Sequence, residues 1–202
     1  MLGEHKQGVL LVLSAPSGCG KDTVLARLSG VRRSISMTTR AMREGEVDGV
    51  DYYFVTQDYF LKQLREGKIL EYTSYNGNYY GTPKQAVDEW LKAGETVVLK
   101  IEVEGGGNIR KLYPDSVGIF LVPPSMQTLE RRLRNRSSET EDEIHSRLTI
   151  AQNEIKHATE YDYIVVNDDI DCAVSDIQAI IRSEKLRTSR SKNMICEVIN
   201  HA

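Results

Sequence analysis

Apolar and polar residues follow one another along the chain in an order that predicts a parallel sheet with helices between its strands. Residues 8–15 form a short apolar run that ends in small residues, a pattern typical of a central strand buried on both faces. Residues 116–122 and 163–166 form two further apolar strands, and residues 96–103 form another strand. Strands that alternate with helical segments indicate an α/β fold with a parallel core.

Helices are predicted where apolar residues recur at helical spacing between residues that commonly begin or end a helix. Thr82 and Pro83 are suited to be an N-cap and a first helical residue, and Thr140 with Glu143 forms a capping box. The predicted helices cover residues 21–28, 57–65, 83–93, 123–133, 140–157 and 170–186, and the first three end before Gly30, Gly67 and Gly94.

A stretch in the first half of the chain departs from this strand and helix order. Residues 33–55 consist of short segments rich in Ser, Thr, Tyr and Gly, which predict small antiparallel strands. A tyrosine-rich stretch, residues 71–80, is interrupted by Asn76-Gly77, a strong turn signal. We therefore expect a small mixed α+β lobe at residues 35–82, inserted into a core formed by residues 1–34 and 83–202.

Residues 96–103 alternate between apolar and charged side chains. Four apolar residues share one face, and Lys100 and Glu102 lie on the opposite face. In a sheet covered by helices, charged side chains at such positions are expected to line a cleft.

Composition sets limits on partners and compartment. The 202 residues are 40% hydrophobic, which is enough for a buried core, and the formal net charge of -3 gives no general reason to expect nucleic acid or an anionic membrane as partner. The longest apolar run is far shorter than the ~20 residues that cross a bilayer, and no signal peptide opens the sequence. The protein is expected to be soluble, unprocessed and cytoplasmic, and monomer and homodimer both remain open. Neither the four histidines nor the three cysteines show ligand or disulfide spacing; the cysteines are Cys19, Cys172 and Cys196.

The segment between the first strand and the first helix is a candidate phosphate-binding loop. It reads Ala-Pro-Ser-Gly-Cys-Gly-Lys at residues 15–21. Gly18 and Gly20 permit a backbone that points successive N–H groups inward, the helix N-terminus adds partial positive charge, and Lys21 can reach the β and γ oxygens of a triphosphate. An ordinary glycine-rich turn is the alternative interpretation.

This loop departs from the usual pattern at two positions. Ala15 stands in place of the first glycine, and Asp22 stands where a hydroxyl residue that binds magnesium is usual, with Thr23 one position later. A carboxylate beside a triphosphate is repulsive unless it meets the metal or points away. We expect Mg²⁺ contact through Asp22 or Thr23. Cys19 is expected to be a small filler rather than a reactive thiol.

The residues that follow carry a cluster suited to a second phosphate. Arg40 and Arg43 are three apart, and arginine forks bind phosphate oxygens in pairs. The hydroxyl groups of Tyr52 and Tyr80 are suited to donate further hydrogen bonds.

With these motifs the chain resembles the guanylate kinase family, over about residues 9–181. The resemblance is carried by four segments, residues 15–21, 34–55, 77–82 and 132–148. It implies a P-loop parallel sheet with flanking helices, a GMP-binding lobe and a helical lid, and transfer of the γ-phosphoryl group of ATP to GMP with Mg²⁺. For GMP it implies phosphate contacts from Arg40, Arg43, Tyr52 and Tyr80, guanine contacts from Ser36, Glu71 and Thr82, and further contacts from Glu46 and Glu102.

The chemistry of guanine agrees with the implied role of Glu71. Guanine presents N1–H and an exocyclic amino group side by side, and one carboxylate can accept from both, whereas adenine offers no such pair. Taken alone, Glu71 and the tyrosines would be read as ordinary strand and packing residues.

The resemblance also implies an ATP site and a mobile lid. The ATP site comprises residues 15–23 with Arg132, Asn167 and Asp168: Ala15, Pro16, Ser17, Gly18, Cys19, Gly20, Lys21, Asp22 and Thr23. Residues 134–147 form a polar, arginine-rich lid that closes over ATP and excludes water. The catalytic cations are Lys21, Arg40, Arg136 and Arg147. A solvated helix end is the alternative for the lid.

One strand departs from the family pattern of two acidic residues spaced by one. Lys100 occupies the first of these positions and Glu102 the second. Lys100 is expected to pair with Glu102 or Glu104, or to point at a phosphate. The rival functions are a ribosyl phosphate kinase on the same core and a protein-binding module. The basic stretch 182–192 is read as a solvated helix end.

Overall fold

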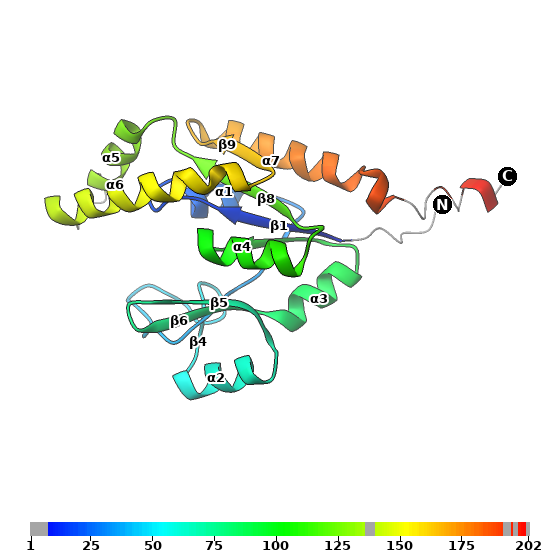
Figure 1. Ribbon diagram of the computed structural model, residues 1–202, viewed down its shortest axis with the longest axis horizontal. Coiled ribbons are helices and arrows are strands. Elements are labelled where there is room, and N and C mark those ends of the chain that lie inside the picture. The colour runs from blue at the N-terminus through cyan, green and yellow to red at the C-terminus, as the bar shows by residue number, and fades with distance from the viewer. Residues whose placement is uncertain (1–7, 136–139, 192–194, 196–197, 201–202) are drawn as a thin grey trace.

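The computed structural model describes residues 8–135, 140–191, 195 and 198–200, and its chain forms two sheets (Figure 1). The larger sheet has five parallel strands in the order β2-β7-β1-β8-β9. These strands are β1 (Val9–Ser14), β2 (Arg32–Arg33), β7 (Thr96–Lys100), β8 (Val117–Val122) and β9 (Tyr163–Val166). The predicted α/β fold with a parallel core is confirmed.

Every residue of β1 is buried, because helices cover both faces of the sheet. Leu11 and Leu13 belong to the cluster on one face, with α1 (Lys21–Arg27) and α7 (Ile170–Lys185). Leu10 and Val12 belong to the cluster on the other face, with α3 (Lys84–Lys92) and α4 (Val103–Leu112). Alternate residues of one strand therefore hold two helical layers.

The second sheet has the order β4-β3-β6-β5 and carries helix α2. In the hairpin between its last two strands, Asn76 (φ 49°) and Gly77 (φ 73°) both have positive φ, so the predicted turn is confirmed. The elements are β3 (Met37–Thr38), β4 (Tyr53–Phe54), β5 (Ile69–Tyr75), β6 (Asn78–Pro83) and α2 (Gln57–Arg65).

The prediction of small antiparallel strands within residues 33–55 is wrong in two respects. Strand β2 pairs with β7 in the core sheet, and β3 pairs in parallel with β4 while it pairs antiparallel with β6. Strands of two residues carry too little periodic signal to indicate their partners, and β3 and β4 are joined by a long loop rather than by a hairpin turn.

The predicted strand 96–103 is three residues too long, and the helix after it was not predicted. Strand β7 ends at Lys100 and helix α4 begins at Val103. Its Gly105-Gly106-Gly107 run argues against a helix by propensity, but a Cβ on Gly105 would lie 2.6 Å from Glu71 Oε2, and one on Gly106 would lie 2.6 Å from the Tyr161 hydroxyl. Gly105 and Gly106 are needed for close packing, which sequence periodicity does not reveal.

The remaining helices agree with prediction to within a few residues. Helix α3 begins one residue later than expected, with Pro83 as its N-cap, so Thr82 is free for another contact. The capping box of Thr140 and Glu143 is present at the start of α6. The other elements are α5 (Met126–Arg134), α6 (Glu141–Lys156), and the short 3₁₀ helices η1 (His157–Glu160) and η2 (Thr188–Arg190).

The basic stretch 182–192, predicted to be a solvated helix end, packs in part against the fold. Arg190 has a side chain only 5% exposed and lies 3.6 Å from the carboxylate of Glu184, which is itself buried. Within the described residues, no helix is both long enough and apolar enough to span a membrane.

Candidate active site

The loop predicted to bind phosphate joins β1 to α1 at the carboxyl edge of the core sheet. Gly18 (φ 85°) and Gly20 (φ 84°) are in the left-handed region, where other residues are strained. A Cβ on Gly18 would lie 2.7 Å from the Leu133 side chain, and one on Gly20 would lie 2.7 Å from Asn167 Nδ2. The loop is therefore built for glycine at both positions.

Asn167 holds this loop from the end of β9. Its side chain is buried, and Nδ2 donates a hydrogen bond to the Cys19 carbonyl at 2.7 Å. Cys19 is wholly buried, and burial raises the pKa of its thiol to about 12, so it is the expected inert filler. The next residue, Asp168, accepts a hydrogen bond from Arg132 Nη2 at its backbone carbonyl, at 3.3 Å.

Lys21 extends from the first turn of α1 toward the end of β7. Its Nζ lies 3.4 Å from the carbonyl oxygen of Ile101, to which it donates. Burial, followed by the nearby positive charge of Lys100, lowers the pKa of Lys21. Two ammonium groups therefore face the same space above the loop.

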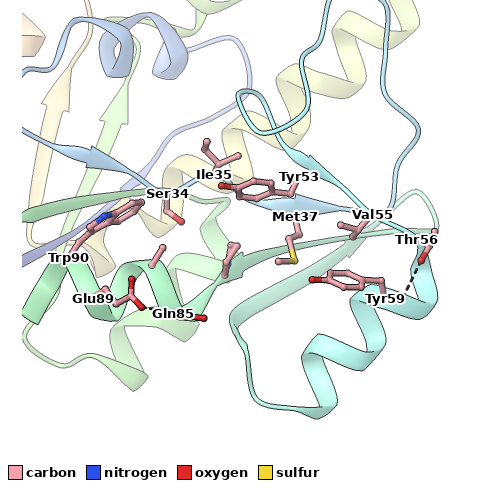
Figure 2. Close-up of a pocket in the computed structure, with 12 residues that line it drawn as sticks. Ser34, Ile35, Met37, Tyr53, Val55, Thr56, Tyr59, Gln85, Glu89 and Trp90 are labelled. Atoms are coloured by element: carbon pink, nitrogen blue, oxygen red, sulfur yellow. Dashed lines mark hydrogen bonds between the residues drawn. The ribbon is translucent and has the colours of Figure 1, made fainter.

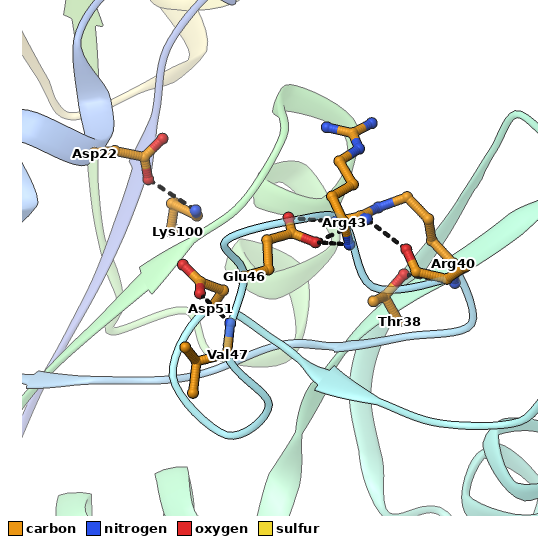
Figure 3. A network of polar contacts seen from close by, with 9 residues as sticks. Asp22, Thr38, Arg40, Arg43, Glu46, Val47, Asp51 and Lys100 are labelled. Carbon is orange, nitrogen blue, oxygen red and sulfur yellow. Dashed lines mark hydrogen bonds and ion pairs between the residues drawn. The ribbon is translucent and has the colours of Figure 1, made fainter.

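Lys100 forms an ion pair with Asp22 rather than with Glu102, and the Glu104 side chain lies outside what the structure describes. Its Nζ lies 2.8 Å from Asp22 Oδ1, next to the phosphate loop (Figure 3). Burial opposes the charge of Lys100, but the hydrogen bond to Asp22 and the charges of Asp22, Tyr52 and Asp51 together outweigh burial, and the pKa of Lys100 is raised. The structure confirms that Lys100 forms an ion pair, and its partner is Asp22.

A cavity of about 210 Å³ lies between the core and the second sheet. Lys100 is part of its wall. Eight of the nine residues predicted to bind GMP also line it: Ser36, Arg40, Arg43, Glu46, Tyr52, Glu71, Tyr80 and Glu102. The ninth, Thr82, donates its hydroxyl to Glu71 Oε1 at 2.7 Å. Residues separated by more than sixty positions are thus brought to one cavity.

Arg40 is held in a fixed orientation at this cavity (Figure 3). Its Nη1 and Nη2 donate to the two carboxylate oxygens of Glu46 at 2.9 and 2.7 Å. Glu46 also accepts from the Arg43 backbone N–H at 2.7 Å, and these bonds, that of Arg40 first, lower its pKa to about 2. The guanidinium lies 5.6 Å from the ring centroids of both Tyr52 and Phe54.

Glu71 is a buried carboxylate with one oxygen left without a partner. The residue is 7% exposed, and Oε1 accepts the Thr82 hydrogen bond. Oε2 has no hydrogen bond among the described residues. Burial raises the pKa of Glu71, the bond from Thr82 opposes that rise, and the charge of Glu102 adds to it. An oxygen left in this state is suited to a ligand that donates hydrogen bonds.

The predicted lid is described only in part. Arg136 lies outside the described residues. Arg134, at the end of α5, forms ion pairs with Glu130 at 2.8 Å and with Glu141 at the start of α6. Arg132 Nη1 is buried and, in the described chain, has no hydrogen-bond partner. Arg147 lies half-buried on α6.

One residue near the phosphate loop was not predicted from the sequence. Glu154, on α6, lies near Lys21 and Glu102, and burial followed by the charge of Glu102 raises the pKa of its carboxyl. A glutamate on an amphipathic helix carries no local signal of such a position.

A second cavity, of about 670 Å³, lies between α3 and the smaller sheet (Figure 2). Trp90 forms part of its wall on the side of α3, and Met37, Tyr53 and Tyr59 on the side of the smaller sheet. It includes none of the predicted site residues.

A glycine loop at a helix N-terminus, facing a cavity that holds two arginines, defines a P-loop phosphotransferase with a phosphorylated acceptor. The model of the guanylate kinase family matches residues 7–184. The chain belongs to the guanylate kinase family, and it is a nucleoside monophosphate kinase that transfers a phosphoryl group from ATP to GMP.

A solved guanylate kinase structure agrees with this family. The chain is similar to the guanylate kinase from Anaplasma phagocytophilum, at 36% identity, over 92% of this chain and 90% of that chain, with a TM-score of 0.76. It is also similar to the shikimate kinase from Bacteroides thetaiotaomicron, at 16% identity, over 86% of this chain and 98% of that chain. The TM-score with that second structure is 0.43.

Proposed function

We propose that GMP binds in the 210 Å³ cavity, with guanine at Glu71 and its phosphate at the arginines. The observation that carries this proposal is the buried Glu71 carboxylate, which has one oxygen bonded to Thr82 and the other unpartnered among the described residues. Guanine supplies two adjacent donors to such a group, and without them the buried oxygen stays unsatisfied. Ser36 and Glu102 complete this end of the cavity. In this proposal residues 35–82 act as the acceptor lobe.

The phosphate of GMP lies at the opposite end of the cavity, against Arg40 and Arg43. Arg40 is already oriented by Glu46, so little side-chain entropy is lost when it binds an anion. Arg43 is exposed, and its guanidinium provides a second pair of N–H donors to the phosphate. The Tyr52 and Tyr80 hydroxyls donate further hydrogen bonds to it. Glu46 positions Arg40 and does not itself contact the phosphate.

ATP binds over residues 15–23, with its triphosphate on the backbone amides and Lys21. Asn167 contributes to ATP binding indirectly, because it holds the Cys19 carbonyl of the loop. Arg132 and Asp168 lie beside the adenosine. Closure of residues 134–147 adds Arg136 and Arg147 to the transferred group and excludes water. Phosphoryl transfer requires alignment and charge stabilisation and needs no covalent intermediate.

The proposed cofactor is Mg²⁺, held at Asp22 and Thr23. No group of three or more acidic, histidine or cysteine residues suited to a metal occurs within the described part of the chain. A metal that keeps several waters and is held by one carboxylate and substrate phosphates fits the Asp22 side chain, which is 80% exposed. The ion supplies charge neutralisation on the phosphates. Titration of ATP binding with Mg²⁺ should change in Asp22→Ser, and an unchanged titration would argue against this role.

One assay tests the acceptor site directly. With Mg-ATP as donor, we expect phosphorylation of GMP and far lower rates with AMP, UMP and CMP. Glu71→Gln should reduce kcat/KM for GMP by about 10²-fold, because the amide carries no charge and replaces one acceptor oxygen by an NH2 group that can only donate. Equal rates with GMP and AMP in the wild-type enzyme would contradict the assignment of guanine to Glu71.

A further inference from the structure

Two of the three residues at which this chain departs from the usual motifs are in contact with each other. Asp22 follows Lys21 where a hydroxyl residue is usual, and Lys100 stands in place of an acidic residue. They lie 78 positions apart in the sequence, yet Nζ and Oδ1 are separated by only 2.8 Å. Each of the two charges is therefore matched by the other.

Lys100 lies between the phosphate loop and the acceptor cavity. It ends β7, in register with Leu13 of the central strand, so its side chain emerges at the carboxyl edge of the sheet. There it joins the wall of the acceptor cavity, and its Nζ lies 5.7 Å from the ring centroid of Tyr52. Arg40 lies 5.6 Å from the same centroid. The two cations share one ring, which places Lys100 at the arginine end of the cavity.

An ammonium group can hold a carboxylate and a phosphate oxygen at the same time. It has three donors, and the hydrogen bond to Asp22 uses one of them. The Lys100 side chain is 34% exposed and that of Asp22 is 80% exposed, so the cation is the more enclosed partner and the carboxylate the more solvated one. The cation thereby offsets a carboxylate that would repel phosphates, and it keeps donors free for a phosphate oxygen.

We propose that Lys100 is a phosphate-binding residue of the acceptor site, and that it offsets the charge of Asp22. This rests on the proposed location of GMP in the same cavity. Lys100 contributes a third positive group beside Arg40 and Arg43. Without Lys100, the Asp22 carboxylate would be uncompensated beside the same phosphate, so loss of the cation removes an attraction and leaves a repulsion.

The test is a titration of GMP by calorimetry with EDTA present and ATP absent, which removes any effect of Asp22 on magnesium. We expect Lys100→Met to weaken GMP binding by at least about 10-fold, as for loss of a charged contact to phosphate. Asp22→Ser should bind GMP at least as tightly as the wild type. The double variant Lys100→Met/Asp22→Ser should bind GMP more tightly than Lys100→Met, because it lacks the uncompensated carboxylate.

Lys84→Met is a matched control. Lys84 forms the same kind of ion pair, 2.6 Å from Asp88 on α3, but does not line the acceptor cavity, and its loss should leave GMP affinity unchanged. Lys100→Arg keeps the charge and should recover most of the affinity lost in Lys100→Met.

Three results would overturn the proposal. They are GMP binding by a folded Lys100→Met within twofold of the wild type, a double variant no tighter than Lys100→Met, and weaker binding by Asp22→Ser. The last result decides the case even where Lys100→Met does not fold. Failure of the wild-type enzyme to bind GMP would instead contradict the proposed acceptor site.

Discussion

The core sheet and the smaller sheet are stabilised in different ways. Every residue of β1 is buried between two helical layers. In β5 the burial is confined to Ile69, Leu70 and Glu71, and the rest of the strand is half-buried or exposed. The smaller sheet relies on aromatic packing around Phe60 and on the ion pair of Arg40 with Glu46.

In the core, different residues provide stability and proposed substrate binding. In the smaller sheet, the same residues are expected to provide both. In the proposed ATP site the core contributes backbone amides and one lysine, while apolar side chains stabilise the fold. In the smaller sheet, Arg40 and Glu71 belong to both the packing and the proposed GMP site. Substitutions there are expected to change affinity and stability together.

The largest expected effect is that of Lys21→Met, in the core. Loss of a preorganised charge at the transferred phosphate should reduce kcat by about 10³-fold. The melting temperature should not fall, because a buried ammonium is replaced by an apolar side chain of similar length. Steady-state kinetics and differential scanning calorimetry measure the two quantities. A clear loss of stability would show that function and fold are not separated in the core.

Arg40→Gln is the corresponding change in the smaller sheet, with an expected loss of about 10²-fold in kcat/KM for GMP. Here the melting temperature should also fall, because Glu46 loses both hydrogen bonds from the guanidinium. In Arg40→Gln/Glu46→Gln the uncompensated carboxylate is absent, so stability should return while activity does not. Recovery of activity in that double variant would rule out a direct contact between Arg40 and phosphate.

Next in size is the pH dependence that Glu71 imposes on GMP binding. The ionised form accepts two donors, and the pKa is raised above the ordinary value of ~4.3, so GMP affinity should fall as the pH is lowered through that raised pKa. The loss should approach about tenfold per pH unit below it. Glu71→Gln should remove the pH dependence of GMP affinity that is due to Glu71. The pH dependence due to ionisation of the GMP phosphate should remain.

The raised pKa of Glu71 also predicts how the stability of the protein depends on pH. Folding favours the protonated carboxyl, so ionisation destabilises the protein as pH rises through the folded pKa. Glu71→Gln should therefore melt higher than the wild type near pH 8, with a smaller difference near pH 5. A constant difference across that range would contradict the link to Glu71.

The smallest expected effect comes from a pair of glycines. Gly77 has φ 73° in the β5–β6 hairpin, so Gly77→Ala should destabilise by about 1 kcal/mol. Gly107 lies within α4, and a Cβ there would meet no atom within 4 Å, so Gly107→Ala should stabilise by about 0.5–1 kcal/mol. Urea unfolding measures both, and the same sign for the two variants would be the contrary result.

The sequence alone predicted the elements whose signals are local. The buried strand at 8–15, the glycine loop before Lys21, the Asn76-Gly77 turn and the capping box of Thr140 each depend on residues close together in the chain, and the structure has all four. Resemblance to a family then identified residues that meet in one cavity, although their roles there remain proposals.

Contacts between distant segments were decided only by the tertiary structure. Helix α4 was missed because its glycines disfavour a helix locally, and the close approach to Glu71 and Tyr161 that requires them is not a local property. The partners of Lys100 and Arg132 depend in the same way on residues far along the chain. Periodicity and capping report the conformation of a segment, whereas the partner of a charged side chain depends on which strand ends and loops the fold brings to the same edge of the sheet.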